Sequence, residues 1–193
     1  MIEEALVVPT AQFQVRRQPL RFDCTLCTDC CTKYIPLIVS EDVRRLIHHT
    51  GLKATDFVRF YSPAQVDMPA NDRTWLRTRQ GKRALGLRKM AGGRCYFLDG
   101  PYCRVNDVKP LLCRMYPFQP INPSQPGPTY FRFPKSEPCP AARDTRVAMR
   151  PLRMLYRAYS DTTWAYEAEV AAFNEATRGR GRAGDFLTFA GLR

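Results

Sequence analysis

The sequence has no long uninterrupted apolar run. Its first apolar stretch, residues 5–8 (ALVV), is short, and Glu3 and Glu4 precede it where a signal peptide is basic. Residues 35–39 (IPLIV) contain Pro36 and are too short to span a bilayer. We therefore expect a soluble, cytoplasmic protein with no membrane insertion.

Histidine is scarce, and the sequence offers no arrangement typical of hydrolytic catalysis. His48 and His49 are the only histidines, and they fall at the expected end of a helix, where a cation interacts favourably with the helix dipole. A metal-ligand role for this pair is the alternative. Asp29 and Asp99 lie near cysteines without a paired carboxylate or a nucleophile–base pair. Residues 81–86 lack the paired glycines of a Rossmann-type nucleotide loop.

Eight cysteines, by contrast, are many for a chain of 193 residues. The cytosol keeps thiols reduced, so clustered cysteines there indicate metal ligands or catalysts. Four disulfides in a secreted protein are the alternative, since eight is an even number. Without an export signal, metal ligation is the interpretation we carry forward.

The first four cysteines form a Cys-x2-Cys-x2-Cys-Cys run: Cys24, Cys27, Cys30 and Cys31. Two intervening residues let the chain turn so that both thiolates reach one metal. The same double spacing occurs in the bacterial ferredoxin run that holds three corners of a [4Fe–4S] cluster. Buried free thiols are the alternative. Adjacent cysteines rarely bind the same metal without a distorted backbone, so we expect Cys30 or Cys31 either to serve a second site or to be a spare thiol.

The other four cysteines, Cys95, Cys103, Cys113 and Cys139, are spread over a segment rich in Pro and Gly. Together the eight thiols can supply one or two sites, holding an iron–sulfur cluster, [4Fe–4S] by spacing, or Zn²⁺. Their grouping cannot be read from spacing alone. Arg114, directly after Cys113, is a candidate cofactor-binding residue that donates to a thiolate, with a surface ion pair as the alternative.

The net charge of +12 comes with one markedly basic segment, residues 73–94, which has eight basic residues, no acidic one, and Trp75. Charge and an aromatic ring together can bind single-stranded nucleic acid. The segment can equally be a solvated face, or can neutralise an anionic thiolate cluster. Nucleic acid is therefore one candidate partner, beside a protein partner.

The length suits one domain with an extension. We expect an α+β fold, in which a small irregular cysteine-rich core with short strands is flanked by helices. The cysteine domain would span residues 1–141, and a helical extension with a flexible basic tail would span residues 142–193. Expected elements are an extended stretch at 11–23, two short helices within 40–61, a hairpin around residues 99–101, a strand at 129–133, and helix from 141 to 177 broken near Pro151. In the first helix Ser40 is the expected N-cap and Gly51 the stop; Thr55 is the expected cap of the second.

Several motifs follow one another in order: Phe22-x-Cys24-x2-Cys27-x2-Cys30-Cys31, Cys95-x-Phe97-Leu98, Cys103-x-Val105, Pro110-x2-Cys113-Arg114-x-Tyr116-Pro117-Phe118 and Cys139-Pro140. In this order the chain resembles the YkgJ-type cysteine-cluster family, over roughly residues 20 to 141. The resemblance implies a zinc- or iron-chelating domain, often labelled an iron–sulfur protein, with all eight cysteines on family positions. Asn106, Lys109 and Ala141 depart from the usual flanking residues.

Three functions follow as hypotheses. The first is an iron–sulfur protein with a redox or accessory role, and the second is a zinc module that acts structurally within a nucleic-acid or protein interface. The third comes from the resemblance: one branch with this signature is similar to flagellin lysine N-methylase, an iron–sulfur protein that uses S-adenosylmethionine.

Overall fold

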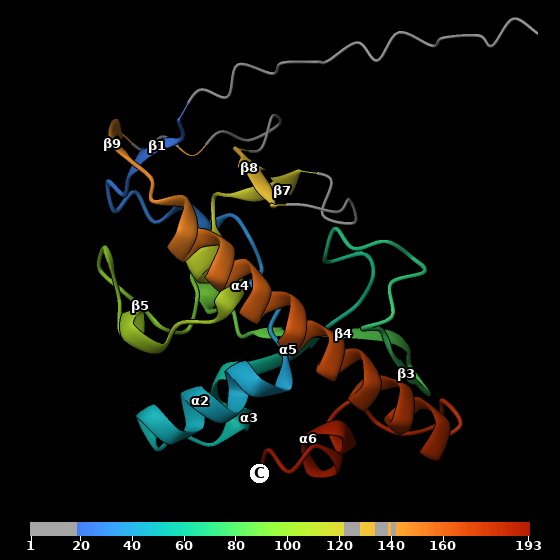
Figure 1. The fold of residues 1–193 in the computed structure, drawn as a ribbon. Helices are drawn as coiled ribbons and strands as arrows, with labels where there is room; N and C mark the ends of the chain where they lie inside the picture. The colour runs from blue at the N-terminus through green and yellow to red at the C-terminus, as the bar shows by residue number, and fades with distance from the viewer. Residues whose placement is uncertain (1–18, 122–127, 134–138, 140–141) are drawn as a thin grey trace, which may run out of the picture.

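A computed structural model describes residues 19–121, 128–133, 139 and 142–193. It shows an α+β fold, as the sequence predicts, in which a long helix runs along one side of several small antiparallel sheets (Figure 1). In this part of the chain no helix combines the length and the apolar character that crossing a membrane requires.

The largest sheet has the strand order β2–β4–β3 and is antiparallel throughout. It consists of β2 (Val58–Tyr61), β3 (Leu76–Thr78) and β4 (Gly81–Leu87). The second half of β4 is buried, and its Leu85 pairs with Phe60 on β2. This apolar half of β4 packs on one side of the hydrophobic core, and its burial stabilises the fold.

Two short helices precede this sheet. Helix α2 (Ser40–Thr50) ends at Gly51, whose left-handed φ of 69° confirms the predicted stop. Ser40 is the first helical residue and not the N-cap, because Val39 precedes it with extended backbone. Helix α3 (Ala54–Phe57) ends before β2, so the prediction of helix over 58–61 was wrong.

Helix α5 (Met149–Ala176) is continuous through the predicted break at Pro151. Pro151 lies in its first turn, where a backbone N–H has no partner within the helix, so proline is tolerated there. Residues 178–184, predicted to be flexible, connect α5 to helix α6 (Asp185–Phe189), and the backbone N–H of Arg79 donates to the carbonyl oxygen of Gly181 at 3.1 Å.

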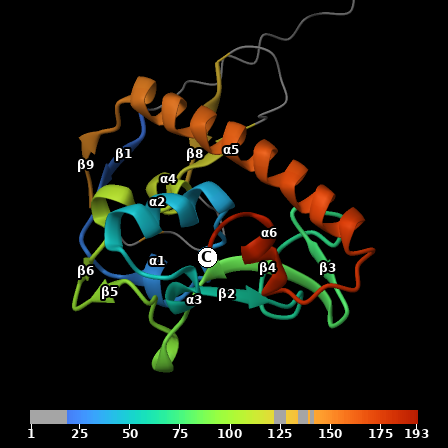
Figure 2. The same ribbon diagram turned by 90° about the horizontal axis from the view of Figure 1, so that it is seen from below.

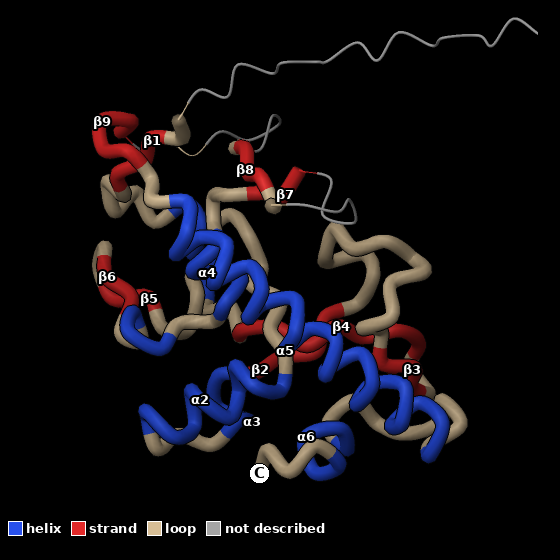
Figure 3. Tube along the Cα trace, viewed as in Figure 1, coloured by secondary structure: helices blue, strands red, loops and turns tan. Residues whose placement is uncertain are grey.

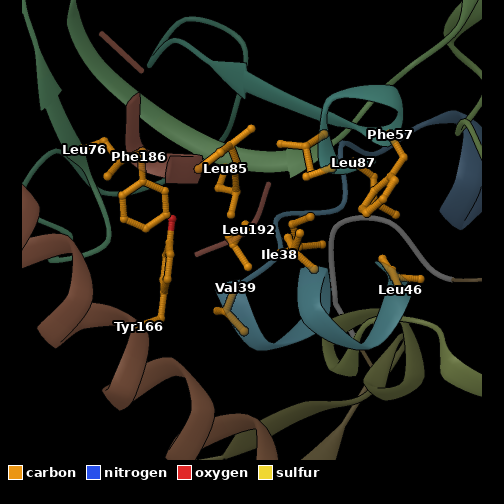
Figure 4. Close-up of a cluster of buried hydrophobic side chains, with 14 of the residues drawn as sticks. Ile38, Val39, Leu46, Phe57, Leu76, Leu85, Leu87, Tyr166, Phe186 and Leu192 are labelled. Atoms are coloured by element: carbon orange, nitrogen blue, oxygen red, sulfur yellow. The ribbon is translucent and has the colours of Figure 1, made fainter. Parts of the chain in front are cut away.

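The hydrophobic core draws side chains from both parts of the chain. Figure 4 shows Tyr166 and Phe186, from α5 and α6, beside Leu76 and Leu85 from the sheet. Leu192, near the C-terminus, is 1% exposed. The C-terminal residues thus bury apolar surface against the cysteine-bearing part, and the boundary at residue 141 stays a prediction.

The remaining elements are short and surround the N-terminal half of α5 (Figure 2). Strand pairs β1·β9, β5·β6 and β7·β8 each form a separate two-stranded sheet. The hairpin predicted around residues 99–101 and the strand predicted at 129–133 are confirmed by β5·β6 and β8, and the stretch predicted at 11–23 is described only from residue 19. The bounds, whose distribution Figure 3 shows, are β1 (Arg21–Asp23), α1 (Asp29–Thr32), the 3-10 turns Ala91–Gly93 and Asn106–Val108, β5 (Leu98–Asp99), β6 (Tyr102–Cys103), α4 (Leu111–Met115), β7 (Gln119–Ile121), β8 (Tyr130–Arg132) and β9 (Ala142–Arg146).

Candidate metal centre

The eight cysteines lie on five stretches of chain, which are residues 24–31 and the single positions 95, 103, 113 and 139. Cys24 and Cys27 are exposed in the loop between β1 and α1. Cys30 and Cys31 lie on α1, Cys95 precedes β5, Cys103 is on β6 and Cys113 is on α4. Cys95 and Cys139 are buried.

The loop that carries Cys27 has an unusual backbone. Leu26 and Thr28, on either side of it, have φ values of 55° and 64°, in the left-handed region that residues with a side chain rarely adopt. Such conformations carry an energetic cost and concentrate at functional sites. The Thr28 carbonyl oxygen then accepts from the N–H groups of Cys31 and Thr32 at 2.8 and 3.0 Å, which starts the single turn of α1.

This turn places two sulfur atoms side by side. The Sγ atoms of Cys30 and Cys31 are 3.8 Å apart. Their hydrogen bond is the main cause of opposite pKa shifts: the pKa of Cys31 is lowered and that of Cys30 is raised. A hydrogen bond from the Cys30 thiol stabilises the thiolate form of Cys31, and the thiolate is the form that binds metal.

Three further thiols act on this pair. After the hydrogen bond and burial, the charges of Cys95, Cys113 and Cys103 influence the pKa of Cys31. Burial is the largest cause of the raised pKa of Cys113, followed by the charge of Cys95. Several thiolates in one poorly hydrated region repel one another, which favours their protonated form. A bound cation offsets this repulsion with its positive charge, and the coordinating thiols then lose their protons.

We call this group the thiol group: Cys30, Cys31, Cys95, Cys103 and Cys113. Its sulfur donors fit zinc or an iron–sulfur cluster better than hard cations such as Mg²⁺. Across the described residues, no three His, Cys, Asp or Glu side chains lie close enough together to hold a metal ion in this conformation. Cys24 and Cys27 lie outside the thiol group, and the assignment of all eight cysteines as ligands stays a prediction.

Lys89 holds the backbone around the thiol group. Its Nζ donates to the carbonyl oxygens of Cys31, Thr32 and Tyr34 at 2.7, 3.2 and 2.7 Å. Burial lowers the pKa of Lys89, while the nearby thiolate charges act in the opposite direction. The sequence marks Lys89 only as one of eight basic residues; nothing local distinguishes it from its neighbours.

We expect Lys89→Met to lower the free energy of unfolding by about 2 kcal/mol, because three carbonyl oxygens lose a charged donor. Thermal unfolding would show this as a fall in Tm of about 4–8 °C. Lys82→Met is the matched control, since Lys82 is exposed and its Nζ donates to the carbonyl oxygen of Ala70. Equal Tm values for the two variants would contradict the role given to Lys89.

Asp42 connects helix α2 to helix α4, which carries Cys113. The carboxylate is 2% exposed and accepts from the N–H groups of Leu111 at 3.1 Å and Val39 at 3.3 Å. Arg45 forms an ion pair with it. Burial is the largest influence on the pKa of Asp42 and raises it. The sequence predicts Asp42 as a first-turn acid, but not its contact with a helix some 70 residues later in the chain.

Arg114 is bound to backbone oxygens. Its guanidinium donates to the carbonyl oxygens of Lys109, at 3.1 Å from Nε, and Asp107. These bonds attach α4 to the turn that precedes it. Donation from Arg114 to a thiolate stays a prediction.

The predicted helix end at the two histidines is confirmed: His48 and His49 lie in the last turn of α2, and both are exposed. Asp29 forms an ion pair with Lys33 at 2.8 Å.

The basic segment 73–94 forms β3, β4 and their connections. Trp75 is 3% exposed, and its indole N–H donates to the carbonyl oxygen of Pro69 at 2.8 Å. Because its ring is in the core, Trp75 cannot offer a face to a nucleobase. The nucleic-acid partner itself stays a prediction.

Comparison with known proteins gives one relationship. A family model named CxxCxxCC, with the description "Putative zinc- or iron-chelating domain", matches residues 23–140. This range contains all eight cysteines together with Lys89 and Asp42. No curated protein and no solved structure matches the chain.

Proposed function

The chain belongs to the CxxCxxCC family of zinc- or iron-chelating domains, and on this premise we propose that its cysteines hold an iron–sulfur cluster in the cytoplasm. The cluster is of the [4Fe–4S] type and serves a redox or accessory role. The observation that carries the proposal is the thiol group, in which α1, α4 and the region around β5 and β6 bring five sulfur atoms within electrostatic range.

Spacing and exposure favour a cluster. The run from Cys24 to Cys30 has the ferredoxin-like double spacing. Cys24 and Cys27 are exposed, and the residues on either side of Cys27 have left-handed backbone, so both thiols are accessible to an incoming cluster. A bound cluster supplies one-electron transfer, and its potential depends on burial and on hydrogen bonds to its sulfurs.

The protein's own residues supply the rest. Lys89 fixes the carbonyl oxygens next to Cys31, and Asp42 fixes the helix that carries Cys113. Burial raises the pKa of the Cys113 thiol. These groups hold the thiols in place and place a positive charge beside an anionic centre.

Zinc is the second candidate, and one observation favours it. Cys95 and Cys139 are buried, as in a closed structural thiolate site. Zinc bound in this way would contribute directly to folding stability. The partner of such a module would be a protein or a nucleic acid.

Reconstitution separates the two metals. Metal-free protein is incubated without oxygen, either with Fe²⁺ and sulfide or with Zn²⁺, and desalted. We expect the first preparation to retain iron and sulfide in a 1:1 ratio and to give an electron paramagnetic resonance signal after reduction. Stoichiometric retention of zinc together with loss of all iron and sulfide on desalting would contradict the cluster and favour the zinc module.

A further inference from the structure

A pocket of about 600 Å³ is lined by residues of helix α5, of β3 and of the segment that leads into β3. Figures 1 and 2 show the half of α5 that runs toward α6 next to β3. Arg73 and Arg77 line one side. The other side is a stripe on α5 that includes Trp164 and the small residues Ala168 and Ala171. Trp164 is 79% exposed, which is unusual for the largest and most apolar aromatic side chain.

The pocket is built on fixed elements. Asn174 accepts from the backbone N–H of Arg77 at 2.6 Å and donates to the carbonyl oxygen of Trp75 at 3.0 Å, which fastens β3 to α5. Arg73 approaches Glu167 across the pocket at 3.9 Å. The core-facing stripe of α5, with Tyr166, Val170 and Phe173 buried, holds the helix in place behind it.

Charge is distributed unevenly around this pocket. Its lining carries two arginines and two glutamates, Glu167 and Glu175, so it offers both donors and acceptors with no net charge. Beyond it, the backbone bond from Arg79 to Gly181 brings the Arg-Gly-Arg-Gly-Arg loop beside the β3–β4 turn. Several exposed basic side chains gather there around the neutral Gln80, and we call four of them the basic rim: Arg79, Lys82, Arg178 and Arg180.

We propose that this surface binds single-stranded nucleic acid, with a base stacked on Trp164 and the backbone phosphates on the basic rim. An exposed indole offers a flat face that any base can stack on, and the rim supplies positive charge for phosphates. The mixed lining of the pocket suits the edge of an unpaired base, which presents donors and acceptors together. Trp164 takes the stacking role that the sequence predicts for Trp75, and the site does not depend on which metal the cysteines hold.

An acidic peptide or an anionic membrane would also be attracted by the basic rim. A phospholipid membrane supplies no flat ring for Trp164, and a peptide that contains only acidic side chains supplies none either. A second copy of the chain would need Trp164 to be buried in a dimer. These occupants are therefore distinguishable by how binding depends on Trp164.

The test is fluorescence anisotropy of a labelled single-stranded deoxythymidine 12-mer, titrated with the protein as purified. We expect Trp164→Ala to weaken binding about 5- to 100-fold, the effect of losing one stacked base. Met154→Ala is the matched control, because Met154 lies on the same helix and is 65% exposed. It should bind as the unmodified protein does.

Salt dependence tests the rim separately. Neutralising Arg79 and Arg180 by Arg79→Gln and Arg180→Gln should reduce the slope of log K against log salt by about 0.7 for each lost phosphate contact. Arg150→Gln, which removes one exposed charge at the opposite end of α5, should leave the slope unchanged.

Three results would overturn the proposal. One is an unchanged affinity for the 12-mer in Trp164→Ala. Another is a dimer of the unmodified protein that Trp164→Ala converts to a monomer, measured by light scattering. The third is binding of polyglutamate or of anionic phospholipid vesicles with the same dependence on Trp164 as the oligonucleotide.

Discussion

Cys113→Ser is expected to reduce the metal bound per protein by about half or more, because a hydroxyl replaces one of the sulfur ligands of the thiol group. A hydroxyl is a poor ligand for a soft metal, and in a buried place it also lacks a partner. The measurement is iron, sulfide and zinc per chain after purification without oxygen. Cys24→Ser and Cys27→Ser should lower the bound metal as well, although their thiols are exposed.

Met115→Leu is the matched control for this series. Met115 lies on α4 with Cys113 and is 3% exposed, and leucine conserves its volume and apolar character. The variant should keep the full metal content. If all three cysteine variants also kept it, the assignment of these cysteines as ligands would be refuted.

Asp42→Ala is expected to lower the free energy of unfolding by about 2–5 kcal/mol, the usual cost of leaving two buried donors without an acceptor. The substitution leaves the N–H groups of Leu111 and Val39 without their acceptor, and the guanidinium of Arg45 without its carboxylate. Urea denaturation monitored by circular dichroism would measure the change. Because α4 loses its attachment to α2, we also expect weaker metal retention.

Asp56→Ala controls for the loss of a helix cap. Asp56 accepts from the backbone N–H of Lys53 at 3.0 Å, as Asp42 does from that of Val39, but it lies at the surface at the start of α3. Its replacement should cost about 1 kcal/mol. An Asp42→Ala variant no less stable than Asp56→Ala would show that the link between α2 and α4 contributes little.

The elements that the sequence predicts correctly are those with local causes. The end of α2 requires only a glycine with positive φ at Gly51, and the β5·β6 hairpin requires only a turn around Gly100. The strand β2 was missed because it follows α3 without a break and forms by pairing with β4, some 25 residues later. Its apolar residues fit either a helix or a strand, and only the distant partner decides between them.

The candidate metal centre also has features that the local sequence predicts and features that depend on distant contacts. The cysteine spacing identifies the chemistry, since thiols at these intervals indicate metal ligands whatever the fold. The grouping of Cys31 with Cys95 and Cys113 depends on contacts between segments far apart in the chain. Lys89 likewise depends on distant contacts, because its three carbonyl partners lie more than 50 residues earlier. The burial of the Trp75 ring in the core also depends on such contacts.

Metal analysis of the protein purified without oxygen, together with its absorption spectrum, tests the central claim most directly. The account predicts iron and acid-labile sulfide in equal amounts and broad absorption in the blue part of the visible spectrum. A colourless protein with stoichiometric zinc would contradict the cluster, because zinc is d¹⁰ and redox-silent. A colourless protein that contains neither metal would contradict the metal centre itself.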